Sequence, residues 1–220
     1  MNFKKITLLL GLSFFILFQS SFAQSERFKD EVAALSERIE KEGWEKGSIL
    51  FTGSSSVRFW QSLQEDFPDQ KIINTGFGGS QASDLIAYLP QLVLKYSPSK
   101  VFIYEGDNDL WAKKEVAEIM GDLDQIVKWI KKENPQTEIY LISAKPSPSR
   151  WDLKLSYLAL NSSMKQYATS NEGVNFVNVW DIMLDEKGQA KSDIFISDEL
   201  HMNAKGYALW KEVFQPFVRN

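Results

Sequence analysis

The sequence predicts an α/β protein, a three-layer α/β/α sandwich around a five-stranded parallel sheet with strand order 2-1-3-4-5. Short apolar runs of about five residues, the length of a buried strand, recur along the chain. Segments with helical periodicity separate these runs, which is the alternation of a doubly wound sheet. Polar and glycine-rich clusters follow several of the runs, and such sheets bind ligands beyond the carboxyl ends of their strands.

The elements follow from the pattern in chain order. Residues 28–42 carry Val32, Leu35 and Ile39 at helical spacing among charged residues, which predicts a helix before the sheet. A longer helix spans residues 116–130, where apolar residues recur on one face until Asn134-Pro135 ends it. A last helix is expected from about Asn203 to Phe217. The five predicted strands are Ser48–Thr52, Lys71–Asn74, Lys100–Tyr104, Glu138–Ser143 and Val174–Val179.

The composition limits the chemistry open to the chain. Its 220 residues fit one domain, and 44% hydrophobic with 25% charged residues is ordinary for a globular protein. The chain has no Cys and one His, so disulfides, thiol nucleophiles and metal sites built from several imidazoles are excluded. Any acid–base chemistry through an imidazole must therefore use His201.

Residues 1–23 have the layout of a secretory signal peptide. Two lysines precede an apolar run, and Ser21 and Ala23 offer small residues for cleavage before Gln24. The run of about thirteen residues is shorter than the roughly 20 that span a bilayer. We therefore expect export to the periplasm or the medium, no stable membrane insertion after cleavage, and a single domain over 24–220. An uncleaved anchor helix is the alternative.

The net charge gives little sign of a nucleic-acid partner. Loss of Lys4 and Lys5 with the leader takes the net charge from −4 to −6. A nucleic-acid binder normally carries a basic surface, so none is expected as a partner. The sequence does not specify an oligomeric state.

Four polar clusters could together perform acyl transfer. A serine nucleophile needs an imidazole to accept its proton, a carboxylate to orient that imidazole, and donors for the oxyanion. Each cluster also has a simpler interpretation, as a helix cap, a tight turn or, for Asp107 and Asp109, a pair of ligands for a hard cation. The clusters are Gly53-Ser54-Ser55-Ser56, Gly76-Phe77-Gly78-Gly79-Ser80, Gly106-Asp107-Asn108-Asp109 and Asp198-Glu199-Leu200-His201.

In this order, the four clusters resemble the blocks of the SGNH (GDSL-type) hydrolase family, over about residues 48–207. The resemblance implies a flavodoxin-like sandwich and makes Ser55 the nucleophile, with Asp198 and His201 completing a triad. It also implies an oxyanion hole formed by the backbone N–H groups of Ser55 and Gly79 and the side-chain amide of Asn108. No cofactor and no metal are expected.

Two positions depart from the family pattern. Ser54 stands where the family usually has Asp, and Ser80 where Asp often follows the oxyanion glycine. Because three serines are consecutive, Ser54 stays open as an alternative nucleophile to Ser55. The Gly-x-Ser-x-Gly elbow of the α/β-hydrolases is absent.

Several aromatic and basic residues near the clusters are candidates for substrate binding. Tryptophan rings stack on sugar faces and arginine can hold a carboxylate or phosphate, although packing in the core or at the rim is the favoured explanation for any single tryptophan. The preferred substrate is a small acyl ester, with O-acetylated carbohydrate as the favoured class. The candidates are Arg58, Trp60, Trp111, Arg150 and Trp151.

Three other functions compete with this one. The same family resemblance allows cleavage of lysophospholipids or thioesters. A glycan-binding module that has kept the fold and lost turnover is a second alternative. A carboxylate metal site at Asp107 and Asp109 is the third, although the sequence supplies no clustered His to complete it.

Overall fold

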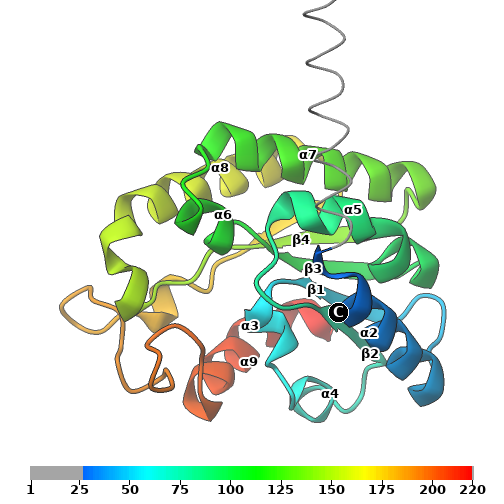
Figure 1. Ribbon diagram of the computed structural model, residues 1–220, viewed down its shortest axis with the longest axis horizontal. Coiled ribbons are helices and arrows are strands. Elements are labelled where there is room, and N and C mark those ends of the chain that lie inside the picture. Colours follow the sequence, from blue (N-terminus) through cyan, green and yellow to red (C-terminus); the bar gives the residue numbers. More distant parts are fainter. Residues whose placement is uncertain (1–26, 220) are drawn as a thin grey trace, which may run out of the picture.

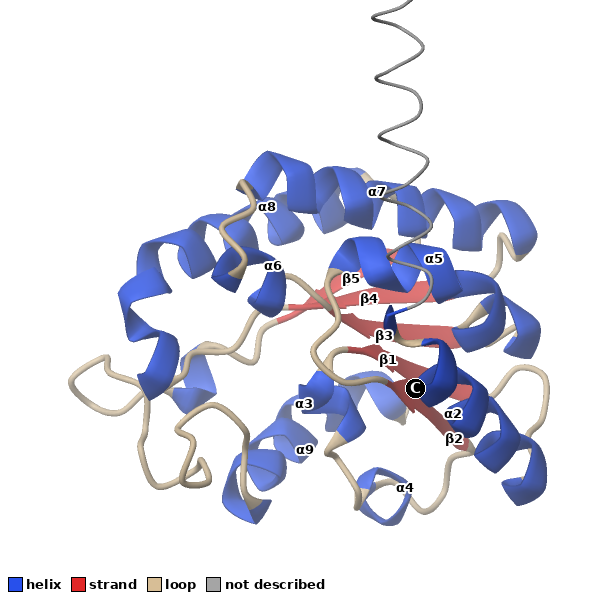
Figure 2. Cartoon of the chain, in the orientation of Figure 1, coloured by secondary structure: helices blue, strands red, loops and turns tan. Residues whose placement is uncertain are grey.

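Five parallel strands form one twisted sheet through the centre of the protein (Figures 1 and 2). The computed structural model describes residues 27–219. The strand order is β2-β1-β3-β4-β5, which confirms the predicted topology. The strands are β1 (Ile49–Gly53), β2 (Ile72–Gly76), β3 (Lys100–Tyr104), β4 (Glu138–Ile142) and β5 (Val174–Val177).

Helices cover both faces of this sheet, as the sandwich requires (Figure 1). One face carries α2 (Lys29–Glu42), α5 (Ala82–Leu92), α6 (Asp107–Trp111), α7 (Val116–Glu133) and α8 (Lys154–Ser170). The other carries α3 (Ser55–Arg58), α4 (Leu63–Asp66) and α9 (Ala204–Val218). Short 3-10 turns complete the chain at η1 (Leu94–Tyr96), η2 (Pro148–Leu153) and η3 (Asp181–Met183).

The two faces of the sheet bury different side chains because successive residues of a strand point in opposite directions. Leu50 of β1 lies in the mainly aliphatic core under α5 and α7, whereas Phe51 lies in the core under α9. That second core is aromatic: the ring of Phe102 stacks between Phe51 and Tyr140, with both centroid distances 4.4 Å. These stacked rings hold three neighbouring strands in register below the site.

Most predicted boundaries fall within two residues of the observed ones. The first strand ends at Gly53 rather than Thr52, and the helix expected near Val57 begins at Ser55. Asn203 caps α9, because its side chain accepts hydrogen bonds from the first free N–H groups of the helix. The predicted signal peptide lies outside the described residues. Within residues 27–219, no helix is long and apolar enough to cross a bilayer.

Gly53 lets the end of β1 lie against the backbone of β3. Its φ of +115° lies in the region that favours glycine, and a Cβ atom there would lie 2.1 Å from the carbonyl oxygen of Tyr104. That same carbonyl accepts a hydrogen bond from the N–H of Ser54 at 3.0 Å. A side chain at position 53 would therefore push Ser54 and Ser55 away from the edge of the sheet.

We expect Gly53→Ala to destabilise the protein by about 2–5 kcal/mol, from the left-handed backbone and from overpacking together. Urea unfolding measures the change. Gly121→Ala is the matched control, because a Cβ on this α7 glycine meets no atom within 4 Å. It should stabilise the protein by about 0.5–1 kcal/mol. Equal effects of the two substitutions would contradict the close approach at Gly53.

Candidate active site

Ser55 and His201 meet beyond the carboxyl ends of the strands, although 146 positions separate them in the sequence. Ser55 begins α3 directly after β1, and His201 lies in the loop before α9. The Oγ atom of Ser55 is 2.9 Å from Nε2 of His201, which is hydrogen-bond distance. Ser54 Oγ instead accepts a hydrogen bond from Asn108 at 2.8 Å. Of these two serines, Ser55 is the one beside the imidazole.

Asp198 holds the other side of the imidazole ring. Its Oδ2 atom is 2.5 Å from Nδ1 of His201. Its Oδ1 atom accepts the backbone N–H groups of Leu200 and His201, both at 2.9 Å. Burial opposes ionisation, but the hydrogen bonds from the His201 ring and from the two backbone groups outweigh it and lower the pKa of Asp198 to about 2. The carboxylate is therefore charged throughout the neutral range.

The ionisation of Asp198 can be tested directly. Because the folded-state pKa lies below the ordinary value, the carboxylate should stay ionised as the pH falls and take up its proton only near pH 2. Carbon-13 NMR of the side-chain carboxyl should show this midpoint. In His201→Ala the midpoint should move up toward the ordinary value, because the ring no longer donates. A wild-type midpoint near 4 would contradict the assignment.

Contacts with other parts of the chain fix the loop that carries His201. The N–H of Ile196 donates to the carbonyl of His201 at 2.9 Å and closes a turn around Asp198. The N–H of Ser149 donates to the carbonyl of Glu199 at 3.2 Å, and the buried amine of Lys145 donates to the carbonyl of Leu200 at 2.8 Å. The segment after β4 thus holds the His201 loop from outside.

Three potential oxyanion donors lie around Ser55. The Asn108 amide nitrogen donates to Ser54 Oγ at 2.8 Å and to the carbonyl of Ser80 at 2.9 Å. Since Ser54 precedes Ser55 and Ser80 follows Gly79, these bonds place the amide next to both. Within the described part of the chain, the backbone N–H groups of Ser55 and Gly79 have no hydrogen-bond acceptor. Free N–H groups at such a position are suited to an anionic oxygen.

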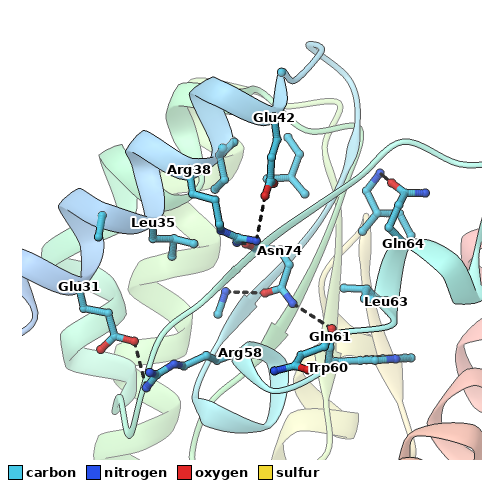
Figure 3. Close-up of a pocket in the computed structure, with 16 residues that line it drawn as sticks. Glu31, Leu35, Arg38, Glu42, Arg58, Trp60, Gln61, Leu63, Gln64 and Asn74 are labelled. Atoms are coloured by element: carbon cyan, nitrogen blue, oxygen red, sulfur yellow. Dashed lines mark hydrogen bonds and ion pairs between the residues drawn. The ribbon is translucent and has the colours of Figure 1, made fainter.

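Helix α2 holds the glycine loop from the side. Glu31 accepts the N–H of Gly78 at 2.9 Å and pairs with Arg58 at 3.2 Å. The ring of Phe28 packs edge-on against Phe77 at 5.1 Å between centroids. Figure 3 shows Glu31 and Arg58 at one end of a cleft of about 530 Å³ between α2 and the β2 side of the sheet. This cleft lies beside the glycine loop, and Ser55 and His201 are absent from its lining.

Beneath the glycine loop lies a buried glutamate. Ser80 Oγ donates to Glu105 Oε1 at 2.7 Å, and both side chains are buried. Burial, with the charge of nearby Asp109, raises the pKa of Glu105 well above its usual range. Glu105 is therefore a neutral support for Ser80, whose carbonyl holds Asn108.

Asp107 and Asp109 have separate partners. Asp107 accepts from Arg150 at 2.6 Å and from Tyr157 at 2.5 Å. Asp109 pairs with Lys114 at 3.2 Å and accepts backbone N–H groups. Among residues 27–219, no group of three or more His, Asp or Glu side chains is placed to hold a metal ion. Each of the two carboxylates is therefore bound by its own set of side chains and backbone groups and stabilises the loop.

The predicted substrate-binding tryptophans have three different positions. Trp60 is 1% exposed and packs in the aromatic core, so it belongs to the core and offers a substrate no free face. Trp151 stacks on Trp180 at 6.2 Å, with the Lys154 amine over its ring. Trp111, in contrast, is 60% exposed on α6, the short helix that also carries Asn108.

The two arginines have partners within the protein. Arg150 is 9% exposed and points its guanidinium at Asp107 and Asn108, so its charge is already paired inside the protein. Arg58 pairs with Glu31 and lies over the ring of Phe59 at 5.3 Å.

Sequence reasoning missed Phe59 and Lys145. Phe59 is half-exposed and places its ring edge-on to the His201 ring, 4.9 Å between centroids. Phe59 lies four residues after Ser55, about one helical turn further along. This spacing could have identified Phe59 as a neighbour of the site. Lys145 begins the segment Lys145–Trp151 that follows the fourth strand, but the sequence did not indicate its burial, since a lysine after a strand is ordinarily at the surface.

This fold and this arrangement of serine, histidine and carboxylate define a class of ester hydrolases. The sequence model of the GDSL-like Lipase/Acylhydrolase family matches residues 41–209. The chain belongs to this family and is an ester-hydrolysing enzyme.

Solved structures share the fold over most of the chain. A protein from Streptococcus pneumonia described as a platelet activating factor superposes with a TM-score of 0.75 at 25% identity, covering 94% of this chain and 99% of that one. A GDSL-like lipase from Bacteroides thetaiotaomicron gives 0.70 at 22% identity, covering 90% and 98%. An acetylxylan esterase from Geobacillus stearothermophilus gives 0.65 at 16% identity, covering 80% and 95%.

One curated relative is much longer. An N-acylneuraminate cytidylyltransferase from Escherichia coli O18:K1:H7 is 24% identical over 178 residues, which is 78% of this chain. The chain spans 40% of the length of that relative.

Proposed function

We propose that this enzyme hydrolyses small acyl esters, with O-acetylated carbohydrate as the favoured substrate, through a triad of Ser55, His201 and Asp198. The observation that carries the proposal is the hydrogen-bonded chain from Ser55 Oγ to His201 at 2.9 Å and from His201 to Asp198 at 2.5 Å. This is the relation that a serine nucleophile, its base and the orienting carboxylate require.

In the first half-reaction, His201 Nε2 takes the proton of Ser55 Oγ as that oxygen attacks the ester carbonyl. The carboxylate of Asp198 stabilises the imidazolium and keeps Nδ1 as its donor. The N–H groups of Ser55 and Gly79 bind the oxyanion, and Asn108 joins them by shifting one amide N–H from Ser54 Oγ to the oxyanion. The intermediate then collapses to the acyl-serine, and His201 gives its proton to the departing alcohol.

In the second half-reaction, a water molecule replaces the alcohol. His201 removes its proton as the water attacks the acyl carbon, and the same donors bind the second oxyanion. Collapse releases the carboxylic acid and returns the proton to Ser55. Atoms and charges balance without a cofactor.

The surroundings of the site support a carbohydrate ester. Trp111 is 60% exposed on the helix of Asn108, with the Arg150 guanidinium 5.2 Å from its ring centroid, and the exposed part of such a ring can stack on a sugar face. The structural similarity to an acetylxylan esterase shows the fold alone, but that protein's substrate belongs to the class proposed here, O-acetylated carbohydrate. We also propose that residues 1–23 are removed on export; N-terminal sequencing of the protein from its native compartment should begin at or near Gln24.

A substrate panel on the purified chain tests the proposal. We expect kcat/KM to be highest for nitrophenyl acetate and to fall as the acyl chain lengthens. Acetylated xylo-oligosaccharide should be deacetylated, and Trp111→Ala should raise KM for it while leaving nitrophenyl acetate unchanged. Addition of EDTA should have no effect. Faster cleavage of lysophospholipid than of any acetyl ester would overturn the substrate assignment.

A further inference from the structure

The Asn108 side chain is held at both ends of its amide. Its nitrogen donates to Ser54 and Ser80, and its oxygen accepts two hydrogen bonds from Arg150, from Nη1 and Nη2, both at 3.1 Å. A guanidinium has five donors and no acceptor, so only the oxygen end of an amide can face it. Arg150 therefore fixes which way the Asn108 amide points and leaves the nitrogen on the Ser55 side.

Arg150 is itself held rigidly from behind. Its Nη1 donates to Asp107 Oδ1 at 2.6 Å, and the same oxygen accepts the hydroxyl of Tyr157 at 2.5 Å. Asp107 Oδ2 accepts the hydroxyl of Tyr104 at 3.0 Å. Although burial opposes it, the adjacent positive charges of Lys145 and Arg150 lower the pKa of Asp107, so this buried group is an anion. A charged, fully partnered carboxylate is a firm anchor for the guanidinium.

We propose that Arg150 is a positioning residue for the oxyanion hole. Asp107 anchors Arg150, and Arg150 holds the Asn108 amide with its nitrogen toward the oxyanion. This role rests on the proposed function of Asn108. This lowers the barrier because the amide is already oriented: as charge develops, one N–H shifts from Ser54 Oγ to the oxyanion and the side chain itself need not turn. The expectation that Arg150 binds the substrate is replaced by this role, since its N–H groups are directed at Asp107 and Asn108.

The same carboxylate also reaches the other half of the site. Lys145 is 1% exposed, its amine lies 3.6 Å from Asp107 Oδ2, and it donates to the carbonyl of Leu200 at 2.8 Å, one residue before His201. Asp107 thus pairs with two cations: Arg150, which contacts Asn108, and Lys145, which contacts the residue before His201. Lys145 provides a contrast variant, because its hydrogen bond to the Leu200 carbonyl reaches His201 without passing through Asn108.

The test is a double-mutant cycle on purified full-length chains with nitrophenyl acetate. Arg150→Lys keeps the positive charge beside Asp107, but one ammonium cannot reproduce the paired hydrogen bonds to the Asn108 oxygen. We expect kcat to fall about 10- to 100-fold with KM unchanged, because a small displacement of a catalytic group has effects of that size. In the Asn108→Ala background the same substitution should change kcat less than about twofold, since the group that it positions is gone.

Two further variants separate this effect from general damage. Lys145→Met should lower kcat by a similar factor whether or not Asn108 is present. Arg38→Lys, at an exposed α2 arginine that holds the carbonyl of Asn74 at 3.2 Å, should leave kcat unchanged. If Arg150→Lys fails to fold, Asp107→Asn combined with Arg150→Gln removes both buried charges and is expected to show the same dependence on Asn108.

The possible results separate this inference from the proposed function. A loss from Arg150→Lys that is equally large in the Asn108→Ala background overturns the inference, as does a rise in KM, which would assign Arg150 to substrate binding. The inference is also overturned if the effect of Lys145→Met on kcat disappears in the Asn108→Ala background. The cycle would then report non-specific disruption of the site rather than positioning of Asn108. If Asn108→Ala alone leaves kcat unchanged, the oxyanion role of Asn108 fails, and the inference fails with it.

Discussion

Replacing either Ser55 or His201 with alanine is expected to lower kcat by about 10⁶, because the two groups act as one unit in forming the nucleophile. The 2.9 Å contact between Ser55 Oγ and Nε2 is the basis of this expectation. Since each change removes the same unit, the double variant should be scarcely slower than either single one. Asp198→Asn should cost about 10⁴, through the wrong imidazole tautomer. The measurement is single-turnover kinetics with nitrophenyl acetate.

Two neighbouring serines serve as controls for this prediction. Ser56→Ala, in the same run of three, should keep kcat within a few-fold. Ser54→Ala should lose far less than Ser55→Ala, because Ser54 Oγ contacts Asn108 rather than the imidazole. A greater loss from Ser54→Ala than from Ser55→Ala would make Ser54 the nucleophile. Near-normal activity of His201→Ala would contradict the whole mechanism, since the chain has no second imidazole.

Asn108→Ala is expected to lower kcat by about 10²–10³, the typical cost of one oxyanion donor. KM should change little, because the bond to the oxyanion forms fully only in the transition state. Asn108→Asp is a matched variant of nearly the same size that replaces the donor with a charged acceptor. It should be at least as slow as the alanine variant. Normal kcat in a folded Asn108→Ala protein would leave Asn108 as a turn residue only.

The sheet could be predicted because local pattern specifies it. Runs such as 100–104 are too short and too apolar for an exposed helix, so they predict buried strands. The helical segments between them are long enough to connect consecutive strands as parallel crossovers. The same logic placed the three clusters that follow strands, 53–56, 76–80 and 106–109, at one edge, since parallel strands all end there. The family resemblance then supplied candidate roles for Ser55, Asn108 and His201, which the tertiary contacts bring together.

The tryptophans show that sequence pattern alone does not predict which side chains are buried and which are exposed. Trp60 and Trp111 each lie a few residues after a cluster, so sequence proximity ranks them alike. In the structure Trp60 is enclosed by aromatic rings of α9, whereas Trp111 is 60% exposed. The difference comes from α9, which lies about 150 residues further along the chain from Trp60 and covers one face of the sheet only.

The topology, the single imidazole and the clusters that form the candidate site follow from the amino-acid sequence, because each of these depends on residue type and short-range spacing. Long-range contacts determine which serine lies against His201, and they make Arg150 and Lys145 buried partners of Asp107 rather than surface cations. A buried charge is stable only where partners from distant segments replace its lost hydration. Those partners come together only when the chain has folded.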